Sequence, residues 1–224
     1  MKRSLTVLAL LIAALLAGAG WYVYSKQPTR QGTVMLNHLQ GSVTVRYDDR
    51  GVPHIRAENE ADLYRALGYV HAQDRLFQME IMRRLARGEL AEVLGPKLLE
   101  TDKLFRSLRI RERALSYVEH IDHDSSAWKA LQAYLDGINQ YQDSHASPME
   151  FDVLGITKRP FTPEDTISVA GYMAYSFAVA FRTEPVLTYV RDQLGSDYLK
   201  VFDLDWQPKG ALNLAAGDWK DRKG

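Results

Sequence analysis

The stretch GYVHAQDRLFQME, residues 68–80, lies at the centre of the strongest periodic pattern in the chain. Apolar residues recur every three to four positions from 61 to 87, which predicts one long amphipathic helix. Gly88 follows as a C-cap, because glycine readily adopts the left-handed conformation that ends helices. Asp74 and Arg75 fall inside this helix, and we expect them to be buried and paired, since an unpaired buried charge is costly.

Extended segments precede this helix. Residues 34–36, 43–47 and 52–55 are rich in β-branched and apolar residues, and turn signals separate them at 40–41 and 48–51. The sequence therefore predicts a small strand meander before the long helix.

Helical patterns continue after Gly88. They cover residues 89–94, 97–105, 110–120 and 126–141, and 143–148 is expected to be a loop. The predicted fold class is therefore α+β, with helix dominating.

Residues 162–165, Thr-Pro-Glu-Asp, form the best helix start in the chain. Thr can cap, Pro suits the first helical position, and the acids favour the positive end of the helix. The 16 residues 166–181 carry no charge, which predicts a helix buried on most sides as a core or pocket wall. Another helix should follow Glu184 and Pro185 and stop at Gly195.

The N-terminal segment is expected to be a targeting segment. Lys2 and Arg3 precede 22 uncharged residues, 4–25. A cleaved signal peptide fits the apolar run with small residues behind it. We favour the alternative, an uncleaved anchor in the inner membrane, because 22 helical residues span about 30 Å. In both interpretations the residues after Lys26 are expected to be exported to the periplasm or cell envelope.

The composition excludes several kinds of chemistry. The 224 residues include 28 basic and 28 acidic side chains, so no basic surface for nucleic acid is expected. There is no cysteine, which rules out disulfides and a cysteine nucleophile.

No self-contained catalytic motif is present. The chain has no Gly-x-Ser-x-Gly elbow, no phosphate-binding loop and no His-Glu-x-x-His. The segment HIDHD, residues 120–124, could bind a metal, but such a stretch is more often a solvated helix end. His54 and His71 are expected to be hydrogen-bonded structural residues.

Several segments together carry a family resemblance. They are DRGVPHI (49–55), ALGYVHAQDRLFQME (66–80), GELAE (88–92) with Leu94-Gly95, and PFTPED (160–165). At this spacing they closely resemble the N-terminal part of the penicillin acylase family, which includes penicillin G, glutaryl and acyl-homoserine lactone acylases.

The resemblance implies an exported zymogen that cleaves itself into an α and a larger β subunit. The β subunit would begin with a Ser nucleophile whose own α-amine is the base, and would complete a four-layer αββα N-terminal-nucleophile hydrolase fold. The reaction would be hydrolysis of an acyl amide in a β-lactam side chain, an acyl-homoserine lactone or a similar compound. This chain, as the α part, would be inactive alone, with the processing junction just beyond Gly224.

The resemblance also implies site residues. Glu184 matches a glutamate of a structural Ca²⁺ site shared with the β subunit. Met173, Phe177, Phe181 and Arg182 match the helix that walls the acyl pocket. No catalytic residue is expected in this chain.

The expected organisation is a signal or anchor (1–25), a linker (26–32), an α-subunit domain (33–210) and a C-terminal tail (211–224). A competing interpretation is a membrane-anchored helical interaction protein or a truncated, non-catalytic remnant.

Overall fold

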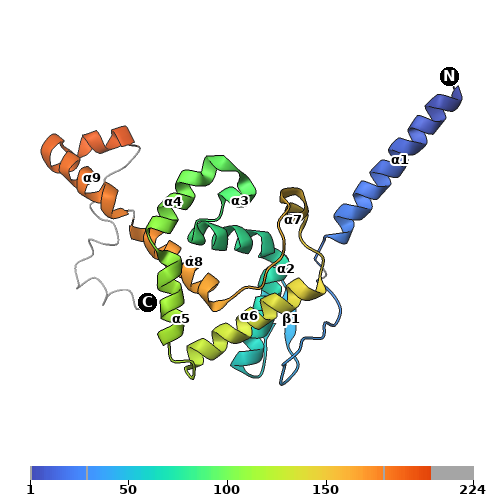
Figure 1. The fold of residues 1–224 in the computed structure, drawn as a ribbon, viewed down its shortest axis with the longest axis horizontal. Coiled ribbons are helices and arrows are strands. Elements are labelled where there is room, and N and C mark those ends of the chain that lie inside the picture. Colours follow the sequence, from blue (N-terminus) through green and yellow to red (C-terminus); the bar gives the residue numbers. More distant parts are fainter. Residues whose placement is uncertain (1, 29, 179, 203–224) are drawn as a thin grey trace, which may run out of the picture. The chain divides into compact units, whose positions relative to one another are not determined.

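The computed structural model describes residues 2–28, 30–178 and 180–202. The chain forms two compact units, residues 1–172 and 173–224. The elements, shown in Figure 1, are α1 (Lys2–Ser25), β1 (Thr44–Tyr47), β2 (Pro53–Arg56), α2 (Glu60–Arg87), α3 (Ala91–Leu94), η1 (Pro96–Leu98), α4 (Leu99–Ser107), α5 (Ile110–His120), α6 (Ser126–Ser144), α7 (Met149–Leu154), α8 (Pro163–Ala178), α9 (Ala180–Leu194) and η2 (Ser196–Phe202).

The first unit is built on the crossing of α2 and α6. A Cβ atom at Gly68 would lie 1.9 Å from the carbonyl oxygen of Tyr134, and one at Gly137 would lie 1.9 Å from that of Arg65. The two helix backbones therefore touch where each lacks a side chain. Around this crossing lies a core of residues from α2, α6, α7 and the segment that follows it: Tyr69, Ala72, Leu76, Leu135, Ile138, Tyr141, Phe151, Ile156 and Phe161.

The long helix is confirmed, with α2 spanning Glu60–Arg87. The Asn59 side chain accepts from the Asp62 N–H at its start, and Gly88 caps its end at φ 66°. The helix bends at Arg75, where φ is −139° and ψ is 18°.

The predicted Asp74–Arg75 pair is wrong. Asp74 instead pairs with Arg30 at 3.3 Å, while Arg75 is exposed. Adjacent residues of a helix point in different directions, so they do not face each other.

The sheet is one antiparallel pair. β1 and β2 pair from Thr44–Arg56 to Tyr47–Pro53 across the predicted turn at 48–51. The predicted strand at 34–36 is wrong: these residues have no strand assignment, and Met35 is 89% exposed. The backbone N–H groups of Gln40 and Gly41 donate to the carboxylate of Asp62, so this turn docks onto α2 and joins no hairpin.

The helices after α2 match the sequence patterns, with small shifts at their ends. α5 has the predicted bounds, α6 runs three residues further than predicted, and 97–105 divides into η1 and α4. The six-residue helix α7 was not predicted, because so short a segment shows no periodicity. It matters for packing, because Phe151 is buried in the core.

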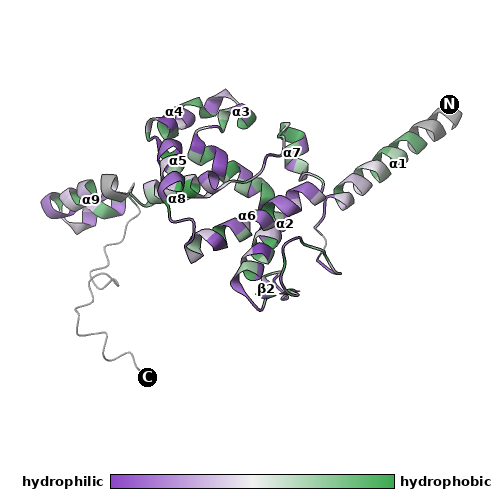
Figure 2. Ribbon diagram, turned by 60° about the horizontal axis from the view of Figure 1, so that its bottom comes forward, coloured by the Kyte–Doolittle hydropathy of each residue, from purple (hydrophilic) through white to green (hydrophobic). Residues whose placement is uncertain are grey.

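Helix α1 exposes large apolar side chains, among them Leu11, Leu15 and Trp21. Figure 2 shows the hydropathy of its residues along the ribbon. Among the described residues, no helix is both long and apolar enough to cross a membrane. The last turn of α1 contacts the body of the first unit. Tyr22 Oη and Lys26 Nζ each donate to Asp152 Oδ2 at 2.6 Å, and Lys26 also donates to the Ser147 carbonyl at 2.8 Å.

The second unit contains α9 and η2. Pro185 lies inside α9, which begins at Ala180, so the helix starts earlier than predicted. It ends at Leu194, before Gly195, as expected. The 3-10 segment η2 was not predicted, and it contributes the buried side chain of Leu199.

Candidate functional site

The start of α8 is held by its own first turn. The N–H and Oγ1 of Thr162 donate to Asp165 Oδ2 at 3.1 and 3.2 Å, and the Asp165 N–H donates back to the Thr162 carbonyl. This reciprocal arrangement satisfies polar groups that a helix N-terminus otherwise leaves open. The helix start predicted at 162–165 is therefore confirmed.

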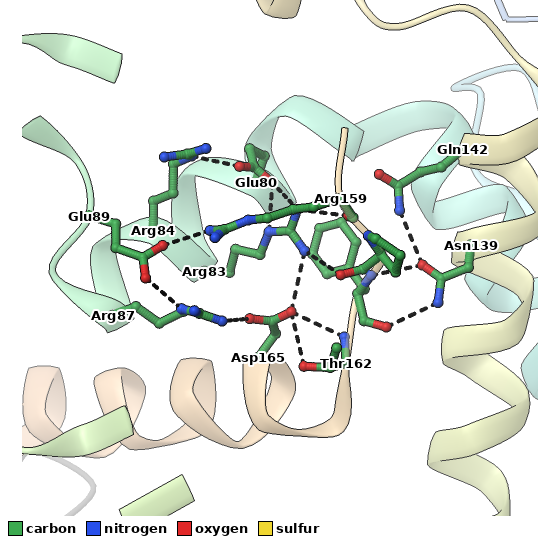
Figure 3. Close-up of polar contacts among 12 residues, drawn as sticks. Glu80, Arg83, Arg84, Arg87, Glu89, Asn139, Gln142, Arg159, Thr162 and Asp165 are labelled. Carbon is green, nitrogen blue, oxygen red and sulfur yellow. Dashed lines mark hydrogen bonds and ion pairs between the residues drawn. The ribbon is translucent and has the colours of Figure 1, made fainter. Parts of the chain in front are cut away.

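Asp165 also ties α8 to α2. Its two carboxylate oxygens receive Arg87 Nη1 at 2.7 Å and Arg83 Nη1 at 3.3 Å, as Figure 3 shows. Asp165 and Arg83 are both buried. An ion pair in such a place needs its remaining donors and acceptors satisfied, or desolvation outweighs the attraction.

The remaining donors of Arg83 are satisfied by its surroundings. Arg83 Nε donates to Glu80 Oε2 at 2.6 Å, and the guanidinium also donates to the carbonyls of Arg159 and Pro160 at 3.0 Å each. Its guanidinium carbon lies 3.9 Å from the ring centre of Phe161. Arg83 thereby holds the segment before α8 as well as α8 itself.

Further ion pairs and the side-chain amide of Asn139 extend the cluster. Arg84 Nε donates to the second oxygen of Glu80 at 2.6 Å. Glu89 accepts from Arg87 at 2.9 Å and from Arg159 at 2.7 Å. On the α6 side, Asn139 exchanges two hydrogen bonds with the backbone of Phe161 (Figure 3).

The charges of the cluster shift two carboxyl groups. Burial alone would raise the pKa of Asp165, but the charge of Arg83 and hydrogen bonds from Arg87 and the Thr162 N–H lower it below its ordinary value. Burial would likewise raise the pKa of Glu89, but the hydrogen bonds and charges of Arg159 and Arg87 outweigh this effect and lower it. Both groups are therefore carboxylates at neutral pH.

The sequence patterns did not predict this cluster, which we call the buried cluster: Glu80, Arg83, Arg84, Arg87, Glu89, Arg159 and Asp165. Five of its members are buried, and Arg87 and Arg159 are partly exposed. A signal was present. Four charged residues recur at three- and four-residue spacing on a helix whose neighbouring positions are apolar. What the sequence could not supply is the partner, because Asp165 lies about eighty residues further along the chain.

Helix α8 carries the predicted acyl-pocket residues Met173 and Phe177. They are 50% and 77% exposed, and Asp165 and Ser168 are the buried side chains of the helix. The prediction that this helix is buried on most sides is therefore wrong for the described chain, because no described element covers that part of α8. Phe181 and Arg182 lie on α9, and their side chains are outside the described part.

The predicted metal ligand Glu184 is an exposed residue of α9. No cluster of three or more His, Asp or Glu side chains able to hold a metal occurs within the described residues. A single carboxylate cannot supply the six to eight oxygens that Ca²⁺ takes. Gly224, the predicted processing junction, lies outside the described residues.

The histidines behave as structural residues. His71 Nδ1 lies 2.5 Å from Tyr134 Oη, and His54 Nε2 lies 3.3 Å from Asp48 Oδ2. In the segment 120–124, His120 and His123 each bond a backbone carbonyl at the end of α5. The hydrogen bonds expected for His54 and His71 are therefore present, and the segment 120–124 lies at the end of α5, as expected for a helix end.

Comparisons with known proteins agree with this architecture. A model of the penicillin amidase family matches residues 42–220. The chain is 42% identical to penicillin acylase 2 proenzyme of Pseudomonas sp. strain SE83 over 63% of its length. It is 32% identical to acyl-homoserine lactone acylase QuiP of Pseudomonas aeruginosa over 80% of its length. The alignments cover only 18% and 21% of those two proteins.

Among solved structures, a chain of the thermostable penicillin G acylase from Alcaligenes faecalis matches with a TM-score of 0.55 and 28% identity. The match covers 72% of this chain and 88% of that one. The fold is thus the helix-rich part, with its small sheet, of a penicillin acylase. The chain belongs to the penicillin amidase family, and it spans about a fifth of the length of the curated relatives it matches.

Proposed function

We propose that this chain is the α-subunit part of an exported acylase that hydrolyses linear acyl amides. The observation that carries the proposal is a contrast in coverage. The chain aligns with about a fifth of its curated relatives, yet it accounts for 88% of the matching chain in a penicillin G acylase structure. In that structure a polypeptide of similar length is a chain of its own.

The catalytic group in this proposal is an N-terminal Ser on a second, larger chain. A Ser hydroxyl is a weak nucleophile and needs an adjacent base. A free α-amine has an ordinary pKa of about 7.7–8.0, which suits a base at neutral pH. Cleavage of a precursor would create this amine, so the α part contributes no nucleophile and is inactive alone.

The role of this chain in the proposal is to present α8 to the acyl group. The buried cluster fixes the first turn of α8 on α2, and the exposed Met173 and Phe177, one turn apart, offer apolar surface beyond it. Phe181 and Arg182 would continue the wall. We further propose that Glu184 supplies one ligand to a Ca²⁺ ion that the larger chain completes, and that the N-terminal segment directs export.

The test is an assay of the assembled protein, this chain with its larger partner, on phenylacetyl, glutaryl and long-chain N-acyl amides. Hydrolysis of at least one class supports the proposal, and replacing the first Ser of the larger chain with Ala should abolish it. Phe177→Ala should raise KM by about tenfold through lost apolar contact. Leu115→Ala, an exposed apolar position on α5, is the matched control. An assembled protein without amidase activity would contradict the proposal.

The calcium proposal has a separate measurement. Removing divalent cations with a chelator should lower the thermal midpoint of the assembled wild type, and Glu184→Gln should remove most of that sensitivity. Glu119→Gln, an exposed glutamate on α5, is the control. Equal sensitivity of wild type and E184Q would contradict this role.

A membrane-anchored interaction protein or non-catalytic remnant is not favoured, because the relatives that the chain matches bear acylase names.

A further inference from the structure

A groove of about 280 Å³ lies between α2, α6 and the first turns of α8. All of its residues belong to the first unit. Met79 and Met82 of α2 face it together with Val169 of α8, and Ile138 and Phe161 contribute further apolar surface. No described element fills it, so apolar side chains are left beside an open space.

The polar groups of the groove are already paired. Arg83 and Asp165 neutralise each other within the buried cluster. Burial raises the pKa of Tyr134 to about 12, so its hydroxyl keeps its proton at neutral pH and can donate it to Nδ1 of His71. In the tautomer that accepts this bond, the imidazole proton is on Nε2, which is a donor. Burial, helped by the charge of Arg75, lowers the pKa of His71, so the ring is neutral at pH 7. The groove therefore fits an uncharged occupant with one hydrogen-bond acceptor.

The groove continues along an open face of α2. The exposed residues Leu67 and His71 lie one turn apart, and His71 lines the groove. Gln78 lines the groove beyond the bend of the helix, and the exposed Arg75 lies at that bend. Arg75 makes no hydrogen bond or ion pair to any described residue. The open surface is thus a long strip with an apolar hollow and one available cation, a shape that suits a polypeptide segment better than a compact small molecule.

We propose that this strip and groove are the docking site for a segment of the larger chain. The segment would place apolar side chains against Met79, Met82 and Val169, a backbone carbonyl at His71, and a carboxylate at Arg75. The inference rests on the proposed function, because the segment that fills the groove belongs to the larger chain. This chain spans about a fifth of its curated relatives, and the larger chain would supply the rest.

Methionine oxidation measures the occupancy of the groove directly. The full chain alone and the assembled protein are treated with hydrogen peroxide, and sulfoxide at each Met is quantified by mass spectrometry. We expect oxidation of Met79 and Met82 to slow by about tenfold on assembly, because susceptibility follows exposure. Met35, 89% exposed in the segment before β1, reports whether the oxidant acts equally in both samples. Unchanged rates at Met79 and Met82 would overturn the proposal.

A filled groove should also prevent assembly. Val169→Trp occupies the space, and we expect it to raise the apparent Kd for the larger chain by about tenfold or more. Leu104→Trp places the same ring on an exposed position of α4 and should leave the Kd unchanged. If V169W folds with wild-type helicity and still assembles normally, the groove is not the docking site. If V169W does not fold, the oxidation experiment on the wild type decides.

The outcomes separate this inference from the proposed function. A complex that hydrolyses acyl amides while Met79 and Met82 stay reactive overturns the docking site alone. A complex that protects both residues yet hydrolyses no amide supports the docking site and contradicts the proposed activity.

Discussion

Asp165 connects two helices through two arginines, and a neutral side chain there would remove one counter-charge from each of Arg83 and Arg87. Arg83 would keep Glu80 and Arg87 would keep Glu89, but the charges shared with Asp165 would lose their partner. Breaking a buried ion pair by removing one partner costs about 3–5 kcal/mol, because the other charge stays desolvated. We expect Asp165→Asn to lower the free energy of unfolding by about 3 kcal/mol, measured by urea denaturation and circular dichroism. Glu100→Gln breaks an exposed pair with Lys103 and should change it by less than about 0.5 kcal/mol. Equal effects would contradict the structural role of the cluster.

The same carboxylates make stability depend on pH. In the folded chain the pKa values of Asp165 and Glu89 lie below their ordinary values, whereas in the unfolded chain these carboxyl groups have pKa values of about 4. Their ionised forms therefore stabilise the fold above that pH, and the contribution is lost as pH falls through the folded pKa values. We expect the free energy of unfolding to fall steeply below about pH 4, with a shallower slope in D165N. Identical slopes in the wild type and D165N would contradict a contribution of Asp165 to the pH dependence of stability.

His71 should titrate below the ordinary histidine pKa of about 6.5, because burial and the neighbouring charge of Arg75 disfavour its protonated form. An NMR titration of the imidazole carbons measures this directly. Arg75→Ala removes one of the two causes and should move the pKa part of the way back. A pKa at or above 6.5 in the wild type would contradict the neutral state on which the groove's chemistry depends.

Residue identities predicted local partners better than distant ones. The Thr162–Asp165 cap was readable because both groups lie in one helical turn. The pairing of Asp74 was not, since its partner Arg30 lies on a segment without regular structure. The cluster around Arg83 was missed for the same physical reason: buried charges on one helix say that partners exist but do not say where they lie in the chain.

At the scale of elements, the crossing of α2 and α6 depends on two glycines. A methyl group at Gly68 or Gly137 would meet a backbone carbonyl oxygen at 1.9 Å, and a backbone cannot swing aside as a side chain can. We expect Gly137→Ala to destabilise the first unit by about 3 kcal/mol or more. Gly20→Ala, on α1 with open space around it, is the matched control and should not destabilise. The measurement is the urea midpoint by circular dichroism, and equal midpoints would contradict the close crossing.

Elements with long periodic patterns were predicted well, and those that depend on tertiary contacts were not. α2 and α5 match because each has several turns of pattern. The strand expected at 34–36 fails because a strand needs a neighbour, and the Asp62 carboxylate binds the following turn instead. The uncharged run of α8 predicted a buried helix, but Met173 and Phe177 are exposed. An apolar helix surface indicates that some element packs on it, but not whether that element belongs to the same chain.

At the scale of the whole molecule, stability should reside in the first unit. Every member of the hydrophobic core cluster lies before residue 172, and in the described second unit Leu199 is the buried apolar side chain. We expect a chain ending at residue 178, which keeps α8 complete, to unfold cooperatively with a free energy within about 1 kcal/mol of the full chain. Urea titration of the two proteins measures the difference. A loss much larger than this would show that the second unit supports the first.

The family was predicted from the motifs at 49–95 and 160–165, and the helix-rich fold from the helical patterns; the comparisons confirm both. The acyl-pocket and calcium residues stay predictions. They lie on α8 and α9, where the groups that would complete a site are not supplied by the described chain.

The buried cluster also sets an order of events in time. Glu80, Arg83 and Arg87 emerge from the ribosome well before Arg159 and Asp165, which follow more than seventy residues later. Until that later segment arrives, only Glu80 and Glu89 can compensate the arginines. Burying the arginines then would leave several donors unsatisfied, so we expect the end of α2 to stay hydrated. A nascent chain released before residue 165 contains both helices of the α2–α6 crossing but lacks α8. We therefore expect completion of the first unit to be a late step of synthesis, which coincides with the arrival of α8.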